Sequence, residues 1–297
     1  MALVAFVVNR TLLRDPRRFL LRCRTAATDR GWDPWFGPGG VQDSLALTRR
    51  AVAAGASLVF AAGGDGTVRA CAEALAGTGV PLAIVPLGTA NLTARALGVP
   101  SQGGRAVEAG FGGRDHAIDL GHLTLVEGAG GTWFAAMAGI GLDAAVVAAA
   151  GERLKRRLGW AAYAAAGVRR LALPPREFTI RPDGTEPLRR RARSVVVANA
   201  GLLPGGFTLL PAARLDDGLL DVGILAPSGG WDWIRLAGRV LARDRRQDRA
   251  LECLQARRVQ VSADAVLPRQ IDGEIVAPGR AFSVSVCPGT LTVRLPG

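Results

Sequence analysis

A glycine-rich turn with a single carboxylate is the part of this sequence best suited to chemistry. Residues 63–67 read Gly-Gly-Asp-Gly-Thr and follow the apolar segment 56–62. Glycine has no Cβ, so backbone N–H groups can approach an anion there, and the N-terminus of a following helix favours negative charge. Asp65 would repel a phosphate unless Mg²⁺ bridges the two or the carboxylate takes part in the reaction. Taken alone, a turn without function explains this short motif equally well.

A second turn of the same kind makes a binding site the better explanation. Residues 86–91 read Pro-Leu-Gly-Thr-Ala-Asn, after the apolar segment 82–85 and before a helix predicted to begin near Ala90. Two consecutive strand–turn–helix units place two helix N-termini along one edge of a sheet. Open α/β sheets bind their ligands at that edge.

Residues 1–120 alternate between strand and helix patterns. Strands are predicted at residues 3–8, 32–36, 56–62 and 82–85, and helices at residues 15–28, 41–54, 68–75 and from residue 90. Such alternation predicts an α/β domain, in which helices cover both faces of a parallel sheet.

Residues 121–297 have a different pattern, dominated by short strands. Strands are predicted at residues 117–125, 132–138, 177–181, 193–198, 219–225, 257–262 and 281–286. Helical segments are predicted at residues 143–171 and 231–243. The sequence therefore predicts a second domain, a mainly antiparallel β-sandwich with helical insertions.

Five segments in a fixed order make the sequence similar to a known family. After the turns at 63–67 and 86–91 come Gly-Ile-Gly-Leu-Asp-Ala at 139–144, Pro-Ala-Ala-Arg-Leu-Asp-Asp-Gly-Leu-Leu-Asp-Val at 211–222 and Ile-Asp-Gly-Glu at 271–274. Together they resemble the diacylglycerol kinase catalytic-domain family. That family includes bacterial soluble diacylglycerol and lipid kinases and sphingosine kinases, and NAD kinases share its first turn more distantly.

The resemblance implies a fold and a set of site residues. The family joins an α/β nucleotide-binding domain to a β-sandwich, with the site in the cleft between them, and its last strand can return to the first domain. ATP would be bound by residues of three loops, namely Asn9, Gly63, Gly64, Asp65, Gly66, Thr67, Val68, Arg69, Gly88 and Thr89.

The catalytic and metal roles are also implied by the resemblance. Asp65 would hold a catalytic Mg²⁺ ion, and Glu274 would be the general base that takes the proton of a lipid hydroxyl. The side chain of Asp217 and the carbonyl groups of Arg214 and Leu219 would bind a second, structural Mg²⁺. In isolation, the segment 272–274 is better explained as a hairpin turn.

The sequence departs from the family pattern at three places. Asn9 is followed by Arg10 rather than by proline, and Arg69-Ala70 stand where the family has Asn-Glu. The threonine expected near residues 36–40 is not found. Both carboxylate motifs, at 214–221 and 272–274, are complete.

Phosphoryl transfer from ATP to a lipid hydroxyl is the expected function. No Gly-Lys pair of a P-loop occurs, so backbone amides, arginine and Mg²⁺ would have to do the work of the P-loop lysine. Diacylglycerol is the first candidate substrate, and a sphingoid base or another long-chain alcohol stays open. Two alternatives are an NAD-kinase-like enzyme and a weakly active ATP-binding regulatory protein, the latter suggested by Arg69-Ala70.

The charge predicts where such an enzyme would work. The formal net charge is +12, and Lys155 is the only lysine. Arginine-rich clusters at residues 153–157, 189–193 and 243–246 would attract anionic phospholipids, although a solvated charged face is the better explanation of any single cluster. Nucleic acid is not expected as a partner, because no reading helix or aromatic platform accompanies the charge. A homodimer stays open.

Location is predicted from what the sequence lacks. No apolar stretch is long enough for a transmembrane helix, and the N-terminus has no basic region of a signal peptide. Four cysteines occur without a Cys-x-x-Cys pair, which favours a reduced compartment. We therefore expect a cytoplasmic protein, peripheral at the inner face of the membrane.

Overall fold

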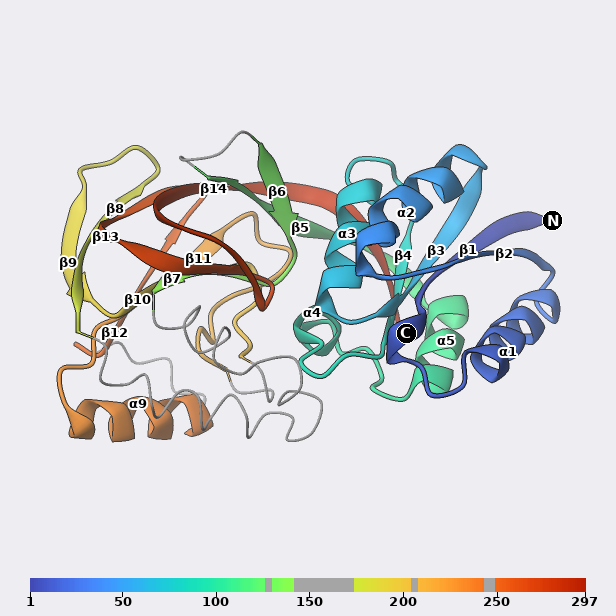
Figure 1. The fold of residues 1–297 in the computed structure, drawn as a ribbon, viewed down its shortest axis with the longest axis horizontal. Helices are drawn as coiled ribbons and strands as arrows, with labels where there is room; N and C mark the ends of the chain where they lie inside the picture. Colours follow the sequence, from blue (N-terminus) through green and yellow to red (C-terminus); the bar gives the residue numbers. More distant parts are fainter. Residues whose placement is uncertain (126–129, 142–173, 204–207, 243–248) are drawn as a thin grey trace. The chain divides into compact units, whose positions relative to one another are not determined.

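The structure is a computed structural model that describes residues 1–125, 130–141, 174–203, 208–242 and 249–297 (Figure 1). The chain forms two compact units. Unit 1 comprises Met1–Ile118 and Gly289–Gly297, and unit 2 comprises Asp119–Pro288. The sequence-based division fell after residue 120.

Unit 1 is built on a parallel sheet with the strand order β14–β4–β3–β1–β2. Its strands are β1 (Ala2–Asn9), β2 (Trp32–Gly39), β3 (Ala56–Gly63), β4 (Leu82–Pro86) and the end of β14 (Glu274–Leu295). β1 pairs in parallel with both β2 and β3, and β3 pairs in parallel with β4. Parallel pairing of consecutive strands requires crossover helices, so the chain alternates strand and helix as predicted.

Helices lie on both faces of this sheet. Figure 1 shows α2 (Ser44–Ala53) and α3 (Asp65–Leu75) on one face, and α1 (Pro16–Thr28) and α5 (Gly103–Gly112) on the other. Cys23 and Ala27 of α1 pack with Phe6 and Phe60 of the strands. Because both faces are covered, the central strands β1 and β3 are almost entirely apolar, with Asn9 and Ser57 as their polar residues.

Unit 2 is mainly antiparallel, with the strand order β12–β11–β10–β7–β13–β14. Its strands are β5 (Arg114–Leu125, which begins in unit 1), β6 (Gly131–Phe134), β7 (Met137–Gly141), β8 (Arg176–Pro182), β9 (Leu188–Ala192), β10 (Ser194–Ala198), β11 (Leu220–Leu225), β12 (Leu251–Ala256), β13 (Arg258–Ile271) and β14. Alternate strand residues such as Val195, Val197, Val259 and Val261 form its core. Helix α9 (Gly230–Ala242) packs on the sheet through Trp233 and Leu236.

The predicted fold class is confirmed, and the differences are local. The predicted strand 132–138 is two strands, because the backbone leaves the ladder at Ala135 and Ala136 to bind a buried carboxylate. Helix α3 begins at Asp65 rather than near residue 68, since Gly64 is its N-cap. Helix α4 (Leu92–Ala96) begins later than expected, because Asn91 has a left-handed conformation with φ +47°.

Four described elements were not predicted from the sequence, namely the 3-10 helix η1 (Arg10–Leu12), α5, β9 and β12. Strand β9 was missed because its arginine run 189–191 lacks the apolar residues typical of a strand. The predicted helix 143–171 and the clusters 153–157 and 243–246 lie outside the described residues.

The chain returns to unit 1 at its end. Val293 of β14 pairs with Leu82 of β4, and the Arg294 guanidinium forms an ion pair with Asp115 at 2.7 Å. This pair holds the pKa of the Asp115 carboxyl below its usual value, because the Arg294 hydrogen bond favours the charged form. Within the described residues, no helix combines the length and the apolar character needed to cross a bilayer.

Candidate functional site

Two glycine turns lie side by side at the carboxyl edge of the parallel sheet in unit 1. Gly63, the last residue of β3, is in register with Pro86, the last residue of β4. The Leu87 N–H donates a 2.8 Å hydrogen bond to the Gly63 carbonyl, which joins the two turns directly. The α-helical ladder of α3 begins with the Val68 N–H bound to the Gly64 carbonyl. The N–H groups of residues 65–67 therefore lie outside that ladder, at the positive end of the helix dipole.

Glycine is required where the two turns meet. A Cβ at Gly88 would lie 2.7 Å from the Gly64 Cα atom and 2.9 Å from Asn91 Oδ1. Asn91 holds this second turn, since its Oδ1 accepts the Gly88 N–H at 3.0 Å and its Nδ2 donates to the Gly88 carbonyl at 2.7 Å. Bare backbone therefore lines the junction, which suits the close approach of a phosphate.

Asp65 belongs to the first turn, and its side chain is bound to helix α4, which follows the second turn. Its Oδ1 accepts the Leu92 N–H at 2.6 Å, so the carboxylate caps the first turn of α4. The side chain is half-buried and stands in the first turn of α3, where helix geometry also favours an acidic group. The hydrogen bond from the Leu92 N–H thus fixes Oδ1 of Asp65 and orients the carboxylate.

The other residues of unit 1 that were predicted to bind the nucleotide differ in the burial and the hydrogen bonds of their side chains. Asn9 ends β1 next to the Gly63 edge, and its Oδ1 accepts from the N–H and the hydroxyl of Thr11 at 3.2 and 2.8 Å. Thr67 and Val68 are buried, so any contact of theirs with a ligand would come from the backbone. Arg69 is half-buried and Thr89 is exposed. Gly63, Gly64, Gly66 and Gly88 offer backbone alone.

Glu274 begins β14 directly after a tight turn in unit 2. Ile271 and Glu274 pair across the hairpin of β13 and β14, so Asp272 and Gly273 form a two-residue loop. Both loop residues have positive φ, +47° and +78°, as a type I′ turn requires. The simple explanation of this segment as a hairpin turn is therefore right, and the half-buried Glu274 side chain follows it.

Asp272 fastens this turn to the rest of unit 2. The residue is only 2% exposed, and its carboxylate accepts the N–H groups of Ala135, Ala136 and Met137 at 3.0, 2.9 and 2.9 Å. Its own N–H donates to the Met137 carbonyl at 2.8 Å. Such a carboxylate, bound to three backbone donors, makes the turn rigid and so limits where Glu274 can lie.

The same hydrogen-bond network continues to the loop at 214–219. Asn199, fully buried at the end of β10, donates from Nδ2 to the carbonyls of Asp119 and Ala135 at 2.7 and 3.2 Å. The Asp119 carboxylate accepts the Gly218 N–H at 2.7 Å, and the Asp119 N–H donates to the Leu215 carbonyl at 2.6 Å. Asp119 and Asn199 were not predicted as site residues. The available signals were a charged residue inside the apolar part of β5 and a polar residue directly after the apolar strand β10.

Replacing Asp272 with alanine is expected to destabilise unit 2 by roughly 3 kcal/mol or more. Three buried N–H groups would lose their acceptor, and unsatisfied buried donors cost about 1–3 kcal/mol each. Alanine is also strained at the positive φ of this position. Urea unfolding of Asp272→Ala beside Asp272→Asn, which keeps an oxygen acceptor and tolerates this conformation, measures the difference. An alanine variant within about 1 kcal/mol of the wild type would show that the network is not needed.

The predicted structural metal ligands lie together on one loop. Asp217 is exposed, and its Oδ1 accepts the Leu219 N–H at 3.0 Å, while Gly218 turns the chain with φ +71°. Burial raises the pKa of the Asp221 carboxyl, and the nearby Asp217 charge adds to this effect against the lowering by Gln255. In the described part of the chain, no three His, Cys, Asp or Glu side chains gather as a metal site would need. One carboxylate and two carbonyls could still bind a hard cation, with water completing its coordination.

Two protein-family models match the chain, one for each part. The diacylglycerol kinase catalytic domain matches residues 20–123, and the YegS C-terminal NAD kinase beta sandwich-like domain matches residues 136–295. The second match alone covers more than half of the chain. Both turns of unit 1 fall within the first match, and Asp217 and Glu274 fall within the second.

Curated relatives resemble the chain over nearly its whole length. A "Probable lipid kinase YegS-like" protein from Pseudomonas fluorescens is 34% identical over 293 residues, which cover 96% of this chain and 92% of the relative. A protein of the same name from Pseudomonas aeruginosa is 36% identical over 259 residues, covering 86% of this chain and 82% of that protein.

Solved structures share the fold at low sequence identity. A diacylglycerol kinase from Bacillus anthracis str. Sterne matches with a TM-score of 0.72 and 20% identity, covering 99% of this chain and 96% of the other. An NAD kinase from Archaeoglobus fulgidus in complex with ATP matches with a TM-score of 0.53 and 12% identity, covering 98% and 92%. With the family models and the curated relatives, the motif resemblance is confirmed: the chain belongs to the family of YegS-like lipid kinases, which join a diacylglycerol kinase catalytic domain to a YegS C-terminal domain.

Proposed function

We propose that this protein transfers the γ-phosphoryl group of ATP to the hydroxyl group of a lipid, with diacylglycerol as the first candidate. The observation that carries the proposal is the junction of two glycine turns at the edge of the unit 1 sheet, where the Asp65 side chain of the first turn binds the helix after the second. A phosphate can reach backbone N–H groups there, at the N-terminus of an eleven-residue helix. The membership of the chain in a lipid kinase family supports a lipid as acceptor.

Backbone would bind most of the nucleotide. The N–H groups of residues 65–67, at the start of α3, would donate to the phosphates, because the helical ladder does not use them. Thr89 is exposed on the second turn, and Arg69 is half-buried in the first turns of α3. We assign these two side chains to contacts with the nucleotide that the backbone N–H groups do not make.

Asp65 would hold the catalytic Mg²⁺ ion, directly or through water. Its capping bond to Leu92 orients the carboxylate and leaves further oxygen lone pairs for an ion. When bound, Mg²⁺ neutralises phosphate charge, which is the largest electrostatic obstacle to the attack of an alcohol. Without an ion, a carboxylate at this place would oppose nucleotide binding.

Glu274 would orient the lipid hydroxyl and accept its proton. A carboxylate within hydrogen-bond reach of an alcohol can do both. The rigid turn that precedes Glu274 supports this role, because a base must be held within a fraction of an ångström of its productive position.

One assay separates this proposal from its alternatives. Purified protein is incubated with Mg-ATP and, in separate reactions, with diacylglycerol, a sphingoid base, a long-chain monoalcohol or NAD, and products are identified by mass. A phosphorylated lipid supports the proposal and names the substrate. Phosphorylated NAD alone would instead establish the NAD-kinase-like alternative, which the shared fold keeps open. ATP binding without any product would favour a regulatory protein.

Replacing Asp217 with asparagine is expected to abolish the stabilisation that Mg²⁺ gives the protein. Asparagine keeps an oxygen for the Leu219 N–H and removes only the charge that we assign to the structural ion. Thermal unfolding at increasing Mg²⁺ concentration measures this shift, which ligand linkage predicts for an ion bound to the native state alone. Asp216→Asn is the matched control, since Asp216 is exposed on the same loop and pairs with Arg214. An equal Mg²⁺ shift in both variants and the wild type would exclude Asp217 as a ligand.

A further inference from the structure

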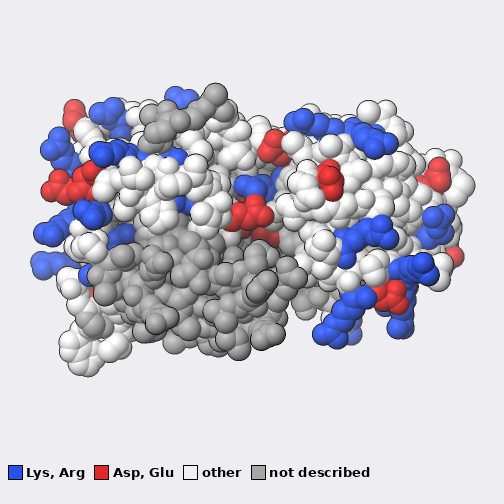
Figure 2. All heavy atoms as spheres, viewed as in Figure 1, with Lys and Arg blue, Asp and Glu red and all other residues white. Residues whose placement is uncertain are grey.

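Helix α1 of unit 1 and the segment just before it are rich in arginine. Six arginines and a single acidic residue, Asp15, lie between residues 10 and 24. The arginines are Arg10, Arg14, Arg17, Arg18, Arg22 and Arg24. All six are exposed. Figure 2 shows arginine atoms gathered over the part of unit 1 where Figure 1 places α1.

Helix α1 carries four of these arginines, Arg17, Arg18, Arg22 and Arg24, around an exposed leucine, and Arg10 and Arg14 precede the helix. Cys23 and Ala27 are buried against the sheet, and helix geometry places Leu21 on the opposite face. Leu21 is 64% exposed. Arg17 and Arg18 lie one turn before Leu21, and so they border it on the same face. We call Arg17, Arg18 and Leu21 the α1 apex.

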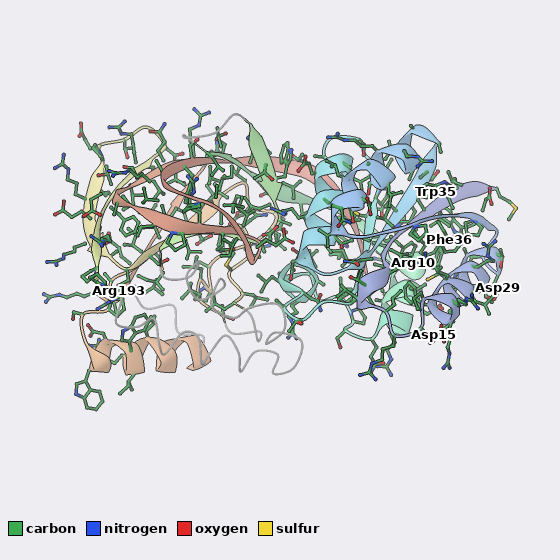
Figure 3. All side chains as sticks on the ribbon, in the orientation of Figure 1. Arg10, Asp15, Asp29, Trp35, Phe36 and Arg193 are labelled. Carbon is green, nitrogen blue, oxygen red and sulfur yellow. The ribbon has the colours of Figure 1, made fainter. Side chains whose placement is uncertain are left out.

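Acidic groups border α1 at its two ends and beside α5, where Glu108 lines a pocket together with Arg22 and forms an ion pair with Arg30. Figure 3 labels Asp15 and Asp29, and these are the N-cap and the C-cap of the helix. Asp15 Oδ1 accepts the Arg18 N–H at 2.9 Å, which ties that carboxylate to the backbone. Arg24 lies over the ring of Phe36, with its Cζ atom 5.2 Å from the ring centroid. The face of α1 that points away from both the sheet and α5 is therefore basic, with Arg17 and Arg18 beside the exposed Leu21.

We propose that the α1 apex docks the protein on a bilayer that contains anionic phospholipids. The arginines would contact the headgroups, and Leu21 would enter the boundary between headgroups and acyl chains. This inference rests on the proposed function in one respect, namely that a lipid kinase must reach a substrate that stays in the bilayer. The charge favours any polyanion, whereas an exposed leucine between arginines suits an interface with an apolar layer beneath it.

The α1 apex differs from the arginine clusters that the sequence alone suggested. Of those clusters, only 189–193 is described, and strand geometry divides it. Arg190 forms an ion pair with Glu252 at 2.7 Å, and Arg193 donates to the Pro227 carbonyl at 2.8 Å. Intramolecular bonds thus use part of that cluster, which makes α1 the stronger docking surface among the described residues.

Vesicle sedimentation tests the proposal without any need for catalysis. Wild-type protein is expected to bind vesicles of equal parts phosphatidylglycerol and phosphatidylcholine, and to bind pure phosphatidylcholine far more weakly. The double variant Arg17→Gln/Arg18→Gln should lower the partition coefficient about 25-fold, since each basic residue near an anionic surface contributes about fivefold. Added salt should weaken wild-type binding, because the Debye length is only about 8 Å at physiological ionic strength.

The Leu21→Ser variant tests the insertion of Leu21 into the bilayer separately from the attraction of the arginines. Vesicle binding of this variant should fall roughly fivefold, as partial burial of a leucine predicts, while its salt dependence stays that of the wild type. The Arg17→Gln/Arg18→Gln variant should show a weaker salt dependence instead. A Leu21→Ser variant that binds vesicles as tightly as the wild type would show that Leu21 does not enter the bilayer, and would contradict that part of the proposal.

A matched control removes the same charge from the other face of the sheet. Arg49 and Arg50 are exposed on α2, so Arg49→Gln/Arg50→Gln changes the net charge equally. The docking surface is excluded if both double variants lose vesicle binding equally. It is also excluded if the α1 variant loses binding to random-sequence duplex DNA while keeping vesicle binding. Activity on detergent-dispersed lipid should be unchanged in every variant. Absence of kinase activity in the wild type would count against the proposed function and leave the binding result standing.

Discussion

Asp65→Asn is expected to lower kcat for phosphoryl transfer about 10³-fold or more, because a metal ion at the phosphates is worth several kcal/mol in the transition state. Asparagine keeps an oxygen that can accept the Leu92 N–H, so the cap of α4 and the fold should persist. The lost negative charge would weaken the hold on Mg²⁺. Steady-state kinetics at several Mg²⁺ concentrations measure the effect, with thermal unfolding as the check on folding.

The matched control for Asp65 is Asp183→Asn. Asp183 is likewise a carboxylate that accepts backbone N–H groups, those of Arg257 and Arg258, but it is exposed in unit 2. This control should retain wild-type activity. If Asp65→Asn retains more than about a tenth of the wild-type kcat, a difference of only 1.4 kcal/mol, then Asp65 is a structural cap and not a metal ligand.

Glu274→Gln should reduce turnover by roughly 10²–10⁴-fold, the range that a general base contributes. Glutamine keeps the size of the side chain and removes the proton acceptor. ATP affinity should change little, because the turns that we assign to the phosphates lie in unit 1. Single-turnover kinetics and a separate ATP-binding titration distinguish these two quantities. Glu177→Gln, at an exposed position of β8, serves as the control.

Two results would remove Glu274 from the proposed mechanism. One is a Glu274→Gln enzyme with most of its turnover intact. The other is a loss of activity that is accompanied by an equal loss of stability, which would assign Glu274 to folding. The Asp272→Asn variant helps here, since it perturbs the same turn and leaves the Glu274 carboxylate in place.

The two glycine turns were predictable because their signals are local. An apolar segment, a Gly-Thr turn and a helical segment follow one another within about twenty residues, and parallel strands end at the same edge of a sheet. Sequence could therefore place Gly63 and Gly88 together, and the structure confirms that their turns touch. It could not show that Asp65 caps α4, since that bond joins residues far apart in the chain and depends on the register of β3 with β4.

The arginines at residues 189–193 are neighbours in the sequence but have different surroundings in the structure. Side chains alternate between the two faces of a strand, so neighbouring arginines of β9 cannot share an environment. Arg190 meets Glu252 of β12, a partner that only the sheet brings within reach. The arginines of helix α1 could likewise be seen in the sequence, but the sequence did not show which face of the helix is exposed. The structure shows it, because Cys23 and Ala27 are buried and Leu21 is exposed on the opposite face.

The fold class of the two parts and the family of the protein could be recognised from the sequence alone, and the phosphate-binding edge of the sheet stays a prediction. Periodicity and turn chemistry act over a few residues, and motif order survives without any knowledge of contacts. The sequence could not show that the Asp272 carboxylate binds three N–H groups of the segment 135–137, or that Asn199 and Asp119 extend this network. A buried carboxylate is stable only where backbone donors converge on it, and those donors come from segments more than a hundred residues away along the chain.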